Sequence, residues 1–357
     1  MTAPELRSVL VVGAGLIGAS IGLALRARSV TVFLADADAE AVALAVERGA
    51  GLPHGGHGSV DLAVVAVPPD SAGKVVRALL DDPNVSAVTD VASVKAPVAD
   101  HLAGHPRSDR YVGGHPMAGR EMSGAAAARA DLFRGRPWVL CPPTAGPANG
   151  AAVELVTQLA LLVGATPVRM TAQEHDAAVA LVSHAPHLVA ALVAARLRDA
   201  PGQDVRLAGG GVSDITRVAA SDPRLWREIL AANAVAVRAV LSALRSDLDA
   251  AIAALETADL DRVEGLLAAG VAGRSRLPGK HGSPHTEYVG VPVELADRPG
   301  QLAGLFADVG EIGVNVEDVR IEHVPGEPVG LVELSVRPDA RPGLVDGLRT
   351  RGWTIHD

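Results

Sequence analysis

The sequence has only one cysteine, Cys141, among 357 residues. No disulfide can form within the chain, and a metal site built from several cysteines is not expected. A chain of this kind suits a reducing compartment, so we expect a cytoplasmic protein. Aromatic residues are also scarce, with three Phe, three Trp and two Tyr. Because 48% of the residues are nevertheless apolar, Ala, Val and Leu must fill most of the core.

Positive charge is in the minority, since 32 Lys and Arg face 41 Asp and Glu and the formal net charge is −9. This balance disfavours nucleic acid or an anionic membrane as the main partner. Uninterrupted membrane-spanning runs are missing as well. Glycines at regular spacing interrupt the apolar stretch within 1–28, and the stretch 177–195 contains two histidines and a proline. We therefore expect a soluble protein without a membrane partner.

The segment SVLVVGAGLIGASIGLALRAR has the pattern of a short strand, a glycine turn and an amphipathic helix. Its glycines fit the spacing G-x-G-x-x-G, which allows a tight turn, the close approach of a pyrophosphate and the packing of the helix on the strand. The helix N-terminus would then face the phosphates. The predicted cofactor contacts in this segment are Gly13, Gly15, Leu16, Ile17 and Gly18.

The next predicted strand, residues 30–36, ends in Asp36, which follows Gly13 by 23 residues. A carboxylate at this place can bind the ribose hydroxyls of NAD and repels the 2′-phosphate of NADP. Neither of the two residues after it is an arginine that could bind such a phosphate. The sequence therefore favours NAD as the cofactor.

Further apolar runs at 61–70 and 85–95 repeat the strand pattern and end in polar loops. Ligands of a doubly wound sheet lie beyond the carboxyl ends of its strands, so residues of these loops should lie near the cofactor. Lys95 has two interpretations, a neighbour of the cofactor or a solvated surface lysine. The predicted cofactor contacts in these loops are Val67, Pro68 and Ser93.

The pattern changes after a last short predicted strand at 165–170. Long Ala- and Leu-rich helical segments follow, apolar enough to bury one another or a second subunit. After a Gly-, Pro- and Ser-rich stretch, the tail has the order strand, helix, strand, strand, helix, strand, which is typical of ferredoxin-like domains. We predict a Rossmann-type NAD-binding domain at 1–170, an all-α dimerisation domain at 171–270, a linker at 271–285 and a ferredoxin-like domain at 286–357. The predicted helices of the all-α domain are 171–198, 213–222, 224–254 and 259–269.

Histidines cluster in the middle of the chain. His115 lies in the unusual stretch GGHPMAGREMSG, and His175, His184 and His187 follow in one predicted helix. A metal site is one interpretation, because His184 and His187 are three residues apart. The spacing H-E-x-x-H is absent, however, and a proline separates these two residues, so we predict no metal. Buried, hydrogen-bonded structural histidines are the other alternative.

A second polar segment, AGGGVSDITRVAASDPRLWREI, contains Arg217 in an apolar setting. The planar guanidinium can donate two parallel hydrogen bonds to one carboxylate, so Arg217 is the best candidate to bind an acidic substrate. The alternative is a surface arginine paired with Asp214 or Asp222.

Six motifs occur in a fixed order: VVGAGLIGASIGLAL, DVASVK, GGHPMAGREMSG, EHDAAVALVSHAPH, SDITRVAASDPRLW and DRPGQLAGLFADVGEIGVNVEDVRIEH. Together they resemble the prephenate and arogenate dehydrogenases that carry a C-terminal ACT domain. The resemblance covers nearly the whole chain, and its histidine motif is far more specific than its glycine motif. It implies an NAD-dependent oxidative decarboxylation of prephenate to 4-hydroxyphenylpyruvate in tyrosine biosynthesis.

The resemblance also implies roles for single residues. His115 would be the base that takes the proton of the ring hydroxyl, which a neutral imidazole can do near pH 7. Ser93 would hydrogen-bond that hydroxyl beside the nicotinamide, and Arg217 would bind a substrate carboxylate. The other predicted substrate contacts are His187 near the side-chain carboxylate, Glu121 at the pocket entrance, His184 and His175.

One departure from the family pattern affects the substrate. Many relatives have Phe followed by a cation where this chain has Val212 and Ser213, which leaves prephenate and arogenate both open. We favour prephenate, because His187 offers a cation for a carboxylate and no acidic residue stands ready for an ammonium group. A β-hydroxyacid dehydrogenase and a non-catalytic sensor of NAD and amino acids are further alternatives. The histidine motif argues against both.

The resemblance further implies a homodimer and a regulatory C-terminal domain that binds tyrosine, the end product of the pathway. The turn between the first strand and helix of that domain would hold the amino acid's carboxylate on backbone N–H groups. The alternative is a tail that adds only dimer contacts, with tyrosine competing at the active site. The predicted regulatory contacts are Asp297, Pro299 and Gly300 in the turn and Asn315 from a neighbouring copy.

Overall fold

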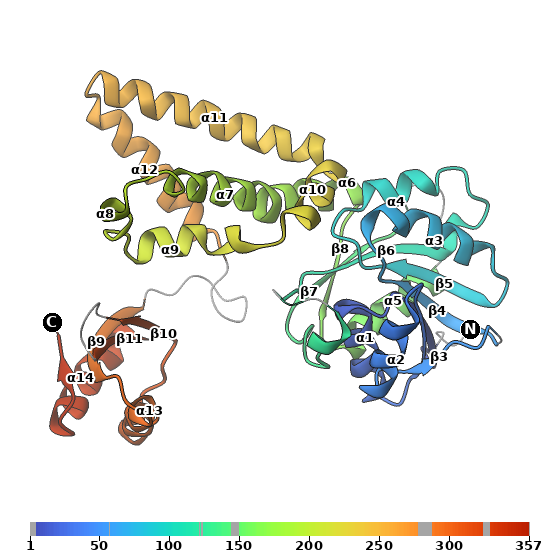
Figure 1. The fold of residues 1–357 in the computed structure, drawn as a ribbon, viewed down its shortest axis with the longest axis horizontal. Coiled ribbons are helices and arrows are strands. Elements are labelled where there is room, and N and C mark those ends of the chain that lie inside the picture. The colour runs from blue at the N-terminus through green and yellow to red at the C-terminus, as the bar shows by residue number, and fades with distance from the viewer. Residues whose placement is uncertain are drawn as a thin grey trace. The chain divides into compact units, whose positions relative to one another are not determined.

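A computed structural model describes residues 5–56, 58–120, 122, 124–143, 150–277, 288–323 and 329–356. The chain divides into two compact units, Met1–Ser246 and Asp247–Asp357. The first unit contains the large sheet and most of the helical region, and the second contains the remaining helices and a small C-terminal sheet (Figure 1).

Eight strands form the large sheet: β1 (Ser8–Val12), β2 (Thr31–Ala35), β3 (Leu52–Pro53), β4 (Val60–Val65), β5 (Val85–Asp90), β6 (Tyr111–Pro116), β7 (Pro137–Cys141) and β8 (Thr166–Arg169). Their order is β3-β2-β1-β4-β5-β6-β7-β8, and all neighbours are parallel except β6 and β7. The strand order changes direction between β1 and β4. Doubly wound proteins bind dinucleotides at the carboxyl ends of the strands beside such a switch point.

Side chains of the central strands alternate between two cores because successive residues of a strand point to opposite faces. Val9 and Val11 belong to one core, and Leu10 between them belongs to the other. The sheet is therefore covered on both faces, as Figure 1 shows. Helices α1 (Leu16–Arg26), α2 (Ala39–Glu47) and α5 (Gly150–Leu162) contribute to the first core, and α3 (Pro69–Asp81) and α4 (Ala96–His101) to the second.

Three strands of this sheet, β3, β6 and β7, are absent from the sequence-based prediction. Strand β6 matters most, because it contains Gly113, Gly114 and His115. Glycines lower the strand propensity of a segment, so the sequence indicated only a turn there. In the structure β6 pairs with β5 on one side and β7 on the other, which places His115 near the carboxyl end of a strand.

The helical region begins with a capping box, in which Thr171 and Glu174 each accept a hydrogen bond from the other's backbone N–H. Helix α6 (Ala172–Val179), a π-helical turn η3 (Ala180–His184) and α7 (Ala185–Leu197) follow without a break. One regular helix was predicted here. The π turn ends two residues before Pro186, which has no backbone N–H for the regular hydrogen-bond ladder.

The remaining helices of this region are α8 (Gly202–Val205), α9 (Gly210–Thr216), η4 (Arg217–Ala220), α10 (Pro223–Ala232), α11 (Ala234–Glu256) and α12 (Leu260–Ser275). The helix predicted over 224–254 breaks at Asn233, where α10 and α11 meet at 96°. Helix α12 continues through residues 271–275, so this part of the predicted linker is helical. The part of that linker from residue 278 onward lies outside the described residues.

By length and hydropathy alone, the described stretch Ala172–Leu197 could cross a membrane, and the bent pair α10 and α11 passes the same test together. Core helices of soluble proteins also pass it. The stretch Ala172–Leu197 carries four buried polar residues, His175, Asp176, His184 and His187.

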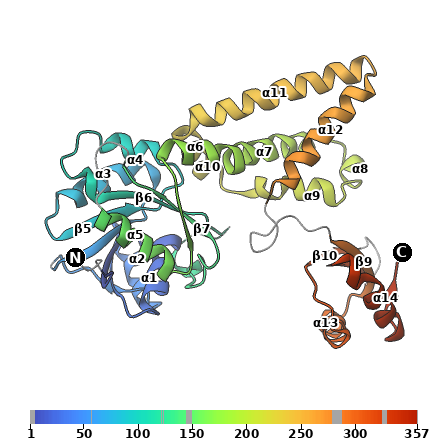
Figure 2. The ribbon, with the colours of Figure 1, turned by 180° about the vertical axis from the view of Figure 1, so that it is seen from behind.

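The C-terminal sheet has the order β10-β11-β9-β12 with antiparallel neighbours. Its elements are β9 (Val289–Ala296), α13 (Gln301–Ile312), β10 (Asp318–His323), β11 (Val329–Val336), α14 (Arg341–Thr350) and β12 (Thr354–Ile355). Side chains of β9, β11, α13 and α14 share one core, so both helices cover the same face of the sheet, and these elements can be followed in Figure 2. The predicted ferredoxin-like order of elements is confirmed.

Candidate active site

The turn between β1 and α1 has the geometry of a pyrophosphate site. Gly13 has a φ of 107°, and a Cβ there would overlap the carbonyl oxygen of Ala66. A Cβ on Gly18 would overlap the backbone of Gly13, whereas the space beside Gly15 is open. Two of the three positions thus require glycine, and the third lets a ligand approach the backbone. Leu16 and Ile17 begin α1, where backbone N–H groups lack partners within the helix.

Asp36 lies beside this turn at the end of β2. Its Oδ2 accepts a hydrogen bond from the backbone N–H of Ala14 at 2.6 Å, and its Oδ1 accepts one from Asp38 at 3.0 Å. The carboxylate is held next to the glycine turn and retains further lone pairs for ribose hydroxyls. The residues present therefore fit a dinucleotide with a free 2′-hydroxyl.

The loops after β4 and β5 carry the other predicted cofactor contacts, Val67, Pro68 and Ser93. A cavity of about 280 Å³ opens next to these loops, lined among others by Pro69, Ala92, Val94 and Glu228. Within the described part of the chain, no hydrogen bond of the Ser93 hydroxyl is found. Ser93 is thus available to a ligand at the carboxyl edge of the sheet.

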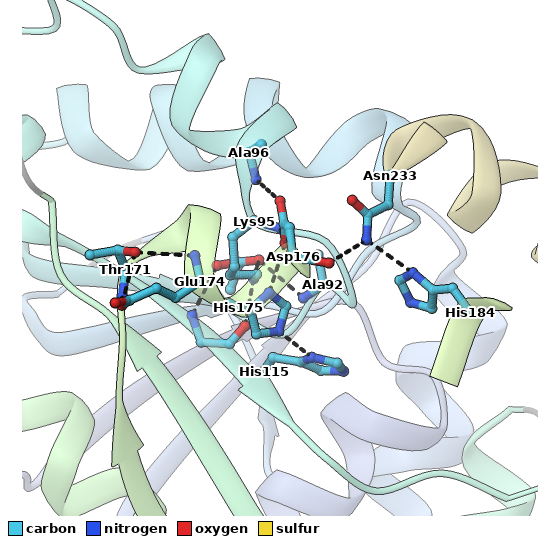
Figure 3. Close-up of polar contacts among 12 residues, drawn as sticks. Ala92, Lys95, Ala96, His115, Thr171, Glu174, His175, Asp176, His184 and Asn233 are labelled. Atoms are coloured by element: carbon cyan, nitrogen blue, oxygen red, sulfur yellow. Dashed lines mark hydrogen bonds and ion pairs between the residues drawn. The ribbon is translucent and has the colours of Figure 1, made fainter. Parts of the chain in front are cut away.

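A chain of three polar side chains ends at His115 (Figure 3). Nδ1 of His115 lies 2.8 Å from Nε2 of His175, and Nδ1 of His175 lies 2.7 Å from Oδ1 of Asp176. The backbone N–H groups of Lys95 and Ala96 also donate to the carboxylate of Asp176, each at 2.8 Å. Burial raises the pKa of Asp176, but the hydrogen bonds from His175 and the two N–H groups outweigh burial and lower that pKa below its usual value.

The hydrogen bonds among Asp176, His175 and His115 determine which ring nitrogen of His115 is free. Ionised Asp176 can only accept, so Nδ1 of His175 carries a proton and donates it. In the neutral ring Nε2 of His175 then accepts, and Nδ1 of His115 must donate to it. Nε2 of His115 is left as an acceptor, which is the atom that a general base requires.

His175 is fully buried, and both of its ring nitrogens are engaged, by His115 and Asp176. These contacts place His175 behind His115, between that residue and Asp176. The predicted substrate contact of His175 stays a prediction.

An ion pair lies behind His115. Lys95 and Asp90 are 1% and 0% exposed and pair with each other, so the interpretation of Lys95 as a solvated lysine is wrong. Nζ of Lys95 also donates to the carbonyl oxygen of Gly114 at 2.6 Å. Oδ1 of Asp90 accepts from the Tyr111 hydroxyl at 2.7 Å and from the Gly114 N–H at 3.2 Å. Burial, followed by the charge of Lys95, lowers the pKa of His115 well below the usual histidine value.

His184 and His187 belong to a second group with Trp226 of α10. The His187 ring stacks on the indole with centroids 3.5 Å apart and an interplanar angle of 8°, and His184 meets it edge-on at 6.1 Å. The Asn233 side-chain amide donates to the carbonyl oxygen of Asp176 at 2.8 Å and lies 3.1 Å from Nδ1 of His184. Burial lowers the pKa of both histidines, which disfavours a cation at His187.

Within the described part of the chain, no hydrogen bond or ion pair joins the predicted substrate contact Arg217 to His115. Arg217 is exposed at the start of η4, and this short helix packs against α7, which carries His187. Glu121 lies outside the described residues. Among the described residues, no group of three or more His, Cys, Asp or Glu is arranged to hold a metal.

Several polar residues of this site were missed in the sequence, namely Asp90, Asp176 and Asn233. Two of them had a signal: Asp90 ends an otherwise apolar strand, and Asp176 follows a histidine in an apolar helix. Asn233 lies in what looked like one continuous helix, so only the bend after α10 shows its position.

A dinucleotide-binding sheet with a neutral histidine at its carboxyl edge defines a nicotinamide-dependent dehydrogenase. Comparison with known families agrees with this class. Residues 21–169 match the family described as "prephenate dehydrogenase, nucleotide-binding domain". Residues 171–269 match the family described as "prephenate dehydrogenase, dimerization domain". The chain belongs to the prephenate dehydrogenase family.

Individual relatives are similar over much of the chain. The probable prephenate dehydrogenase NovF of Streptomyces niveus is 38% identical over 98% of this chain and 99% of its own length. The crystal structure of prephenate dehydrogenase from A. aeolicus with hydroxyphenyl propionate and NAD+ is 27% identical, with a TM-score of 0.67 over 76% of this chain and 99% of that one. Synechocystis arogenate dehydrogenase is 27% identical, with a TM-score of 0.65 over 75% of this chain and 98% of that one.

These comparisons confirm the predicted family, the fold class, the dehydrogenase class and NAD as the cofactor. The dimerisation domain also agrees with the predicted all-α segment and with a dimer that acts on a small molecule. The roles of single residues stay predictions. Both solved structures match about three quarters of this chain, whereas the match to NovF also includes the C-terminal domain.

Proposed function

We propose that this protein catalyses the NAD-dependent oxidative decarboxylation of prephenate to 4-hydroxyphenylpyruvate. The observation that carries the proposal is the chain from Asp176 through His175 to His115, which leaves Nε2 of His115 as a proton acceptor. NAD, when bound, would supply the acceptor for the hydride of C4. His115 takes the proton of the C4 hydroxyl, which becomes a carbonyl as the hydride leaves. Carbon dioxide then leaves C1, its bonding electrons make the ring an aromatic phenolate, and the proton held by His115 returns to the phenolate oxygen to give the product.

Other residues of the site bind and orient in this proposal. The turn at Gly13, Gly15 and Gly18 holds the pyrophosphate of NAD, and Asp36 binds its ribose. Ser93 donates to the substrate hydroxyl beside the nicotinamide. Arg217 binds a substrate carboxylate through its exposed guanidinium. His184 and His187 contact the substrate in this proposal, and so does Glu121, which lies outside the described residues.

The main alternative is arogenate as the substrate, which has an amino group in place of the keto group. The lowered pKa of His187 weakens one argument for prephenate, namely a cation for the side-chain carboxylate. The name of the 38% identical relative NovF supports prephenate, and the fold shared with an arogenate dehydrogenase keeps the alternative open. A non-catalytic sensor would not need the tautomer set by Asp176, which argues against that alternative.

The test is NADH formation, measured by absorbance, with prephenate and with arogenate under equal conditions. A higher kcat/KM with prephenate supports the proposal, and a higher kcat/KM with arogenate replaces its substrate. If neither compound yields NADH while NAD binds, the proposed function is refuted.

The proposal includes a homodimer formed through the helical region. Large apolar side chains are exposed along α6 to α12, including Leu181, Leu192, Leu207, Val235 and Leu267. Exposed apolar area of this kind is typical of a protein interface. A second copy of this chain is the expected partner, because this region matches the dimerisation domain of the family. A single buried cysteine suits the cytoplasm as the place of action.

The proposal also includes feedback inhibition by tyrosine at the C-terminal domain. The turn Asp297 to Gly300 precedes α13, and Gly300 has a φ of 89°, which L-residues rarely adopt. The N–H groups of the first turn of α13 can bind a carboxylate, and the exposed Asn315, whose amide donates to Glu317 at 2.7 Å, adds a polar contact toward a second copy. The tail as a dimer contact alone remains the alternative.

The replacement Gly300→Ala strains this turn, because alanine is disfavoured at that φ. We expect catalysis without tyrosine to stay near normal and tyrosine inhibition to weaken about tenfold or more. The control is Gly343→Ala in α14, at a glycine whose added Cβ has open space. Equal, purely competitive inhibition of both variants would assign tyrosine to the active site.

A further inference from the structure

Lys95 links both sides of the histidine chain. Its side chain donates to the carbonyl oxygen of Gly114, the residue before His115. Its backbone N–H donates to Asp176, which orients His115 through His175. The contacts therefore form a closed ring that runs from Lys95 through Asp176, His175 and His115 and returns through Gly114.

The ion pair binds both polar backbone groups of Gly114, the residue before His115. Asp90 accepts from the Gly114 N–H, and Lys95 donates to the Gly114 carbonyl oxygen. A side chain at Gly114 would overlap the carbonyl oxygen of Asp90, so the strand lies directly against the pair. The Tyr111 hydroxyl occupies a further acceptor site of Asp90. Such contacts leave the β6 backbone no freedom to shift His115 relative to the sheet.

The pair also brings a buried positive charge close to the imidazole. The groups that act on the charge of His115 are Lys95 from the loop after β5, His175 from α6 and His184 from the π turn. Asp90 lies behind Lys95, and Asp176 lies behind His175. Lys95 acts on His115 with the positive charge of its ion pair with Asp90, and a nearby cation disfavours the imidazolium.

We propose that Lys95 is a positioning residue that fixes the backbone at His115 and keeps its imidazole unprotonated. This proposal rests on the function of His115 as the base. A neutral Nε2 can accept the hydroxyl proton, whereas an imidazolium cannot. Lys95 extends the acidic side of the working pH range, because His115 must stay neutral as the pH falls.

The test compares three variants. Two are the single replacements Lys95→Met and Asp90→Asn, and the third is the double variant that carries both. Removal of the cation raises the pKa of His115, so the acidic limb of the kcat/KM profile should move to higher pH, by about one unit in Lys95→Met and by less in the double variant, which also loses the carboxylate. Asp90→Asn leaves the cation less neutralised and should move the limb to lower pH. The double variant guards against misfolding, since a buried pair can be replaced by neutral groups of similar volume with little loss of stability.

Lys74→Met, at an exposed lysine of α3, is the matched control and should leave the limb in place. Lys95→Arg should restore the limb, because it keeps the charge. An NMR titration of the His115 ring, identified by its loss in His115→Asn, measures the same shift without substrate. The proposal would be overturned if the folded variants kept both the acidic limb of the kcat/KM profile and the His115 titration of the wild type. Lys95 would then have a structural role only. A wild-type protein inactive on prephenate would refute the proposed function alone, since the titration still reports on Lys95.

Discussion

His115 and His187 both have a pKa lowered by burial, but their surroundings differ. His115 is joined through His175 to ionised Asp176. Among the described residues, His187 is joined to no such chain, and its ring stacks on the indole of Trp226. A hydrogen-bonded chain that ends in a carboxylate fixes which ring nitrogen of a histidine carries the proton. A stacked ring instead shapes the surface that a ligand would contact. We therefore expect changes near His115 to affect turnover and changes near His187 to affect substrate binding.

The strongest test of this difference is His115→Asn. Loss of the base should lower kcat about 10³-fold and leave NAD affinity nearly unchanged, because the glycine turn is untouched. Steady-state kinetics and NAD titration measure the two effects. His101→Asn, at an exposed histidine of α4, is the control. If both variants turn over equally, His115 has no part in proton transfer.

Asp176→Asn tests the chain behind the base. The asparagine amide can donate to His175, which reverses the order of donors and acceptors and places a proton on Nε2 of His115. We expect kcat to fall about 10²-fold with KM nearly constant. Asp100→Asn, at an exposed carboxylate of α4, should change neither value. A rise in KM at normal kcat would place Asp176 in substrate binding.

Arg217→Ala tests the other region, since η4 packs against the helix of His187. Loss of a bidentate clamp on a carboxylate should raise KM about 10²-fold. The fold should be unaffected, because Arg217 is exposed. Arg28→Ala, at an exposed arginine before β2, is the control. An unchanged KM would show that Arg217 is a surface residue and that another cation binds the substrate.

The smallest effect is expected at Asp36, which lies outside both histidine groups. Asp36→Ala removes the acceptor for the ribose hydroxyls and the repulsion of a 2′-phosphate. The ratio of kcat/KM for NAD to that for NADP should fall about tenfold. Asp38→Ala, which removes the N-cap of α2, is the control for stability. An unchanged ratio would exclude Asp36 from cofactor choice.

The parts predicted well from the sequence are those with a local cause. Glycine spacing, the strand that ends in Asp36 and the order of elements in the tail each reflect backbone geometry or short-range periodicity. The parts predicted poorly depend on distant partners. Strand β6 is held by backbone hydrogen bonds to β5 and β7, and its glycine-rich sequence gives no side-chain pattern that predicts a strand. The break at Asn233 is stabilised by contacts to Asp176 and His184.

The sequence by itself determined the nucleotide-binding turn and the ferredoxin-like order of the tail, and it singled out His115 as the candidate base, because each depends on a short segment. Only the tertiary structure decided the partners of His115. Lys95, His175 and Asp90 come from different elements, and their burial together makes the charge of one group depend on the others. Hydrogen bonds and ion pairs act over a few ångströms in space, so spacing along the chain does not reveal them.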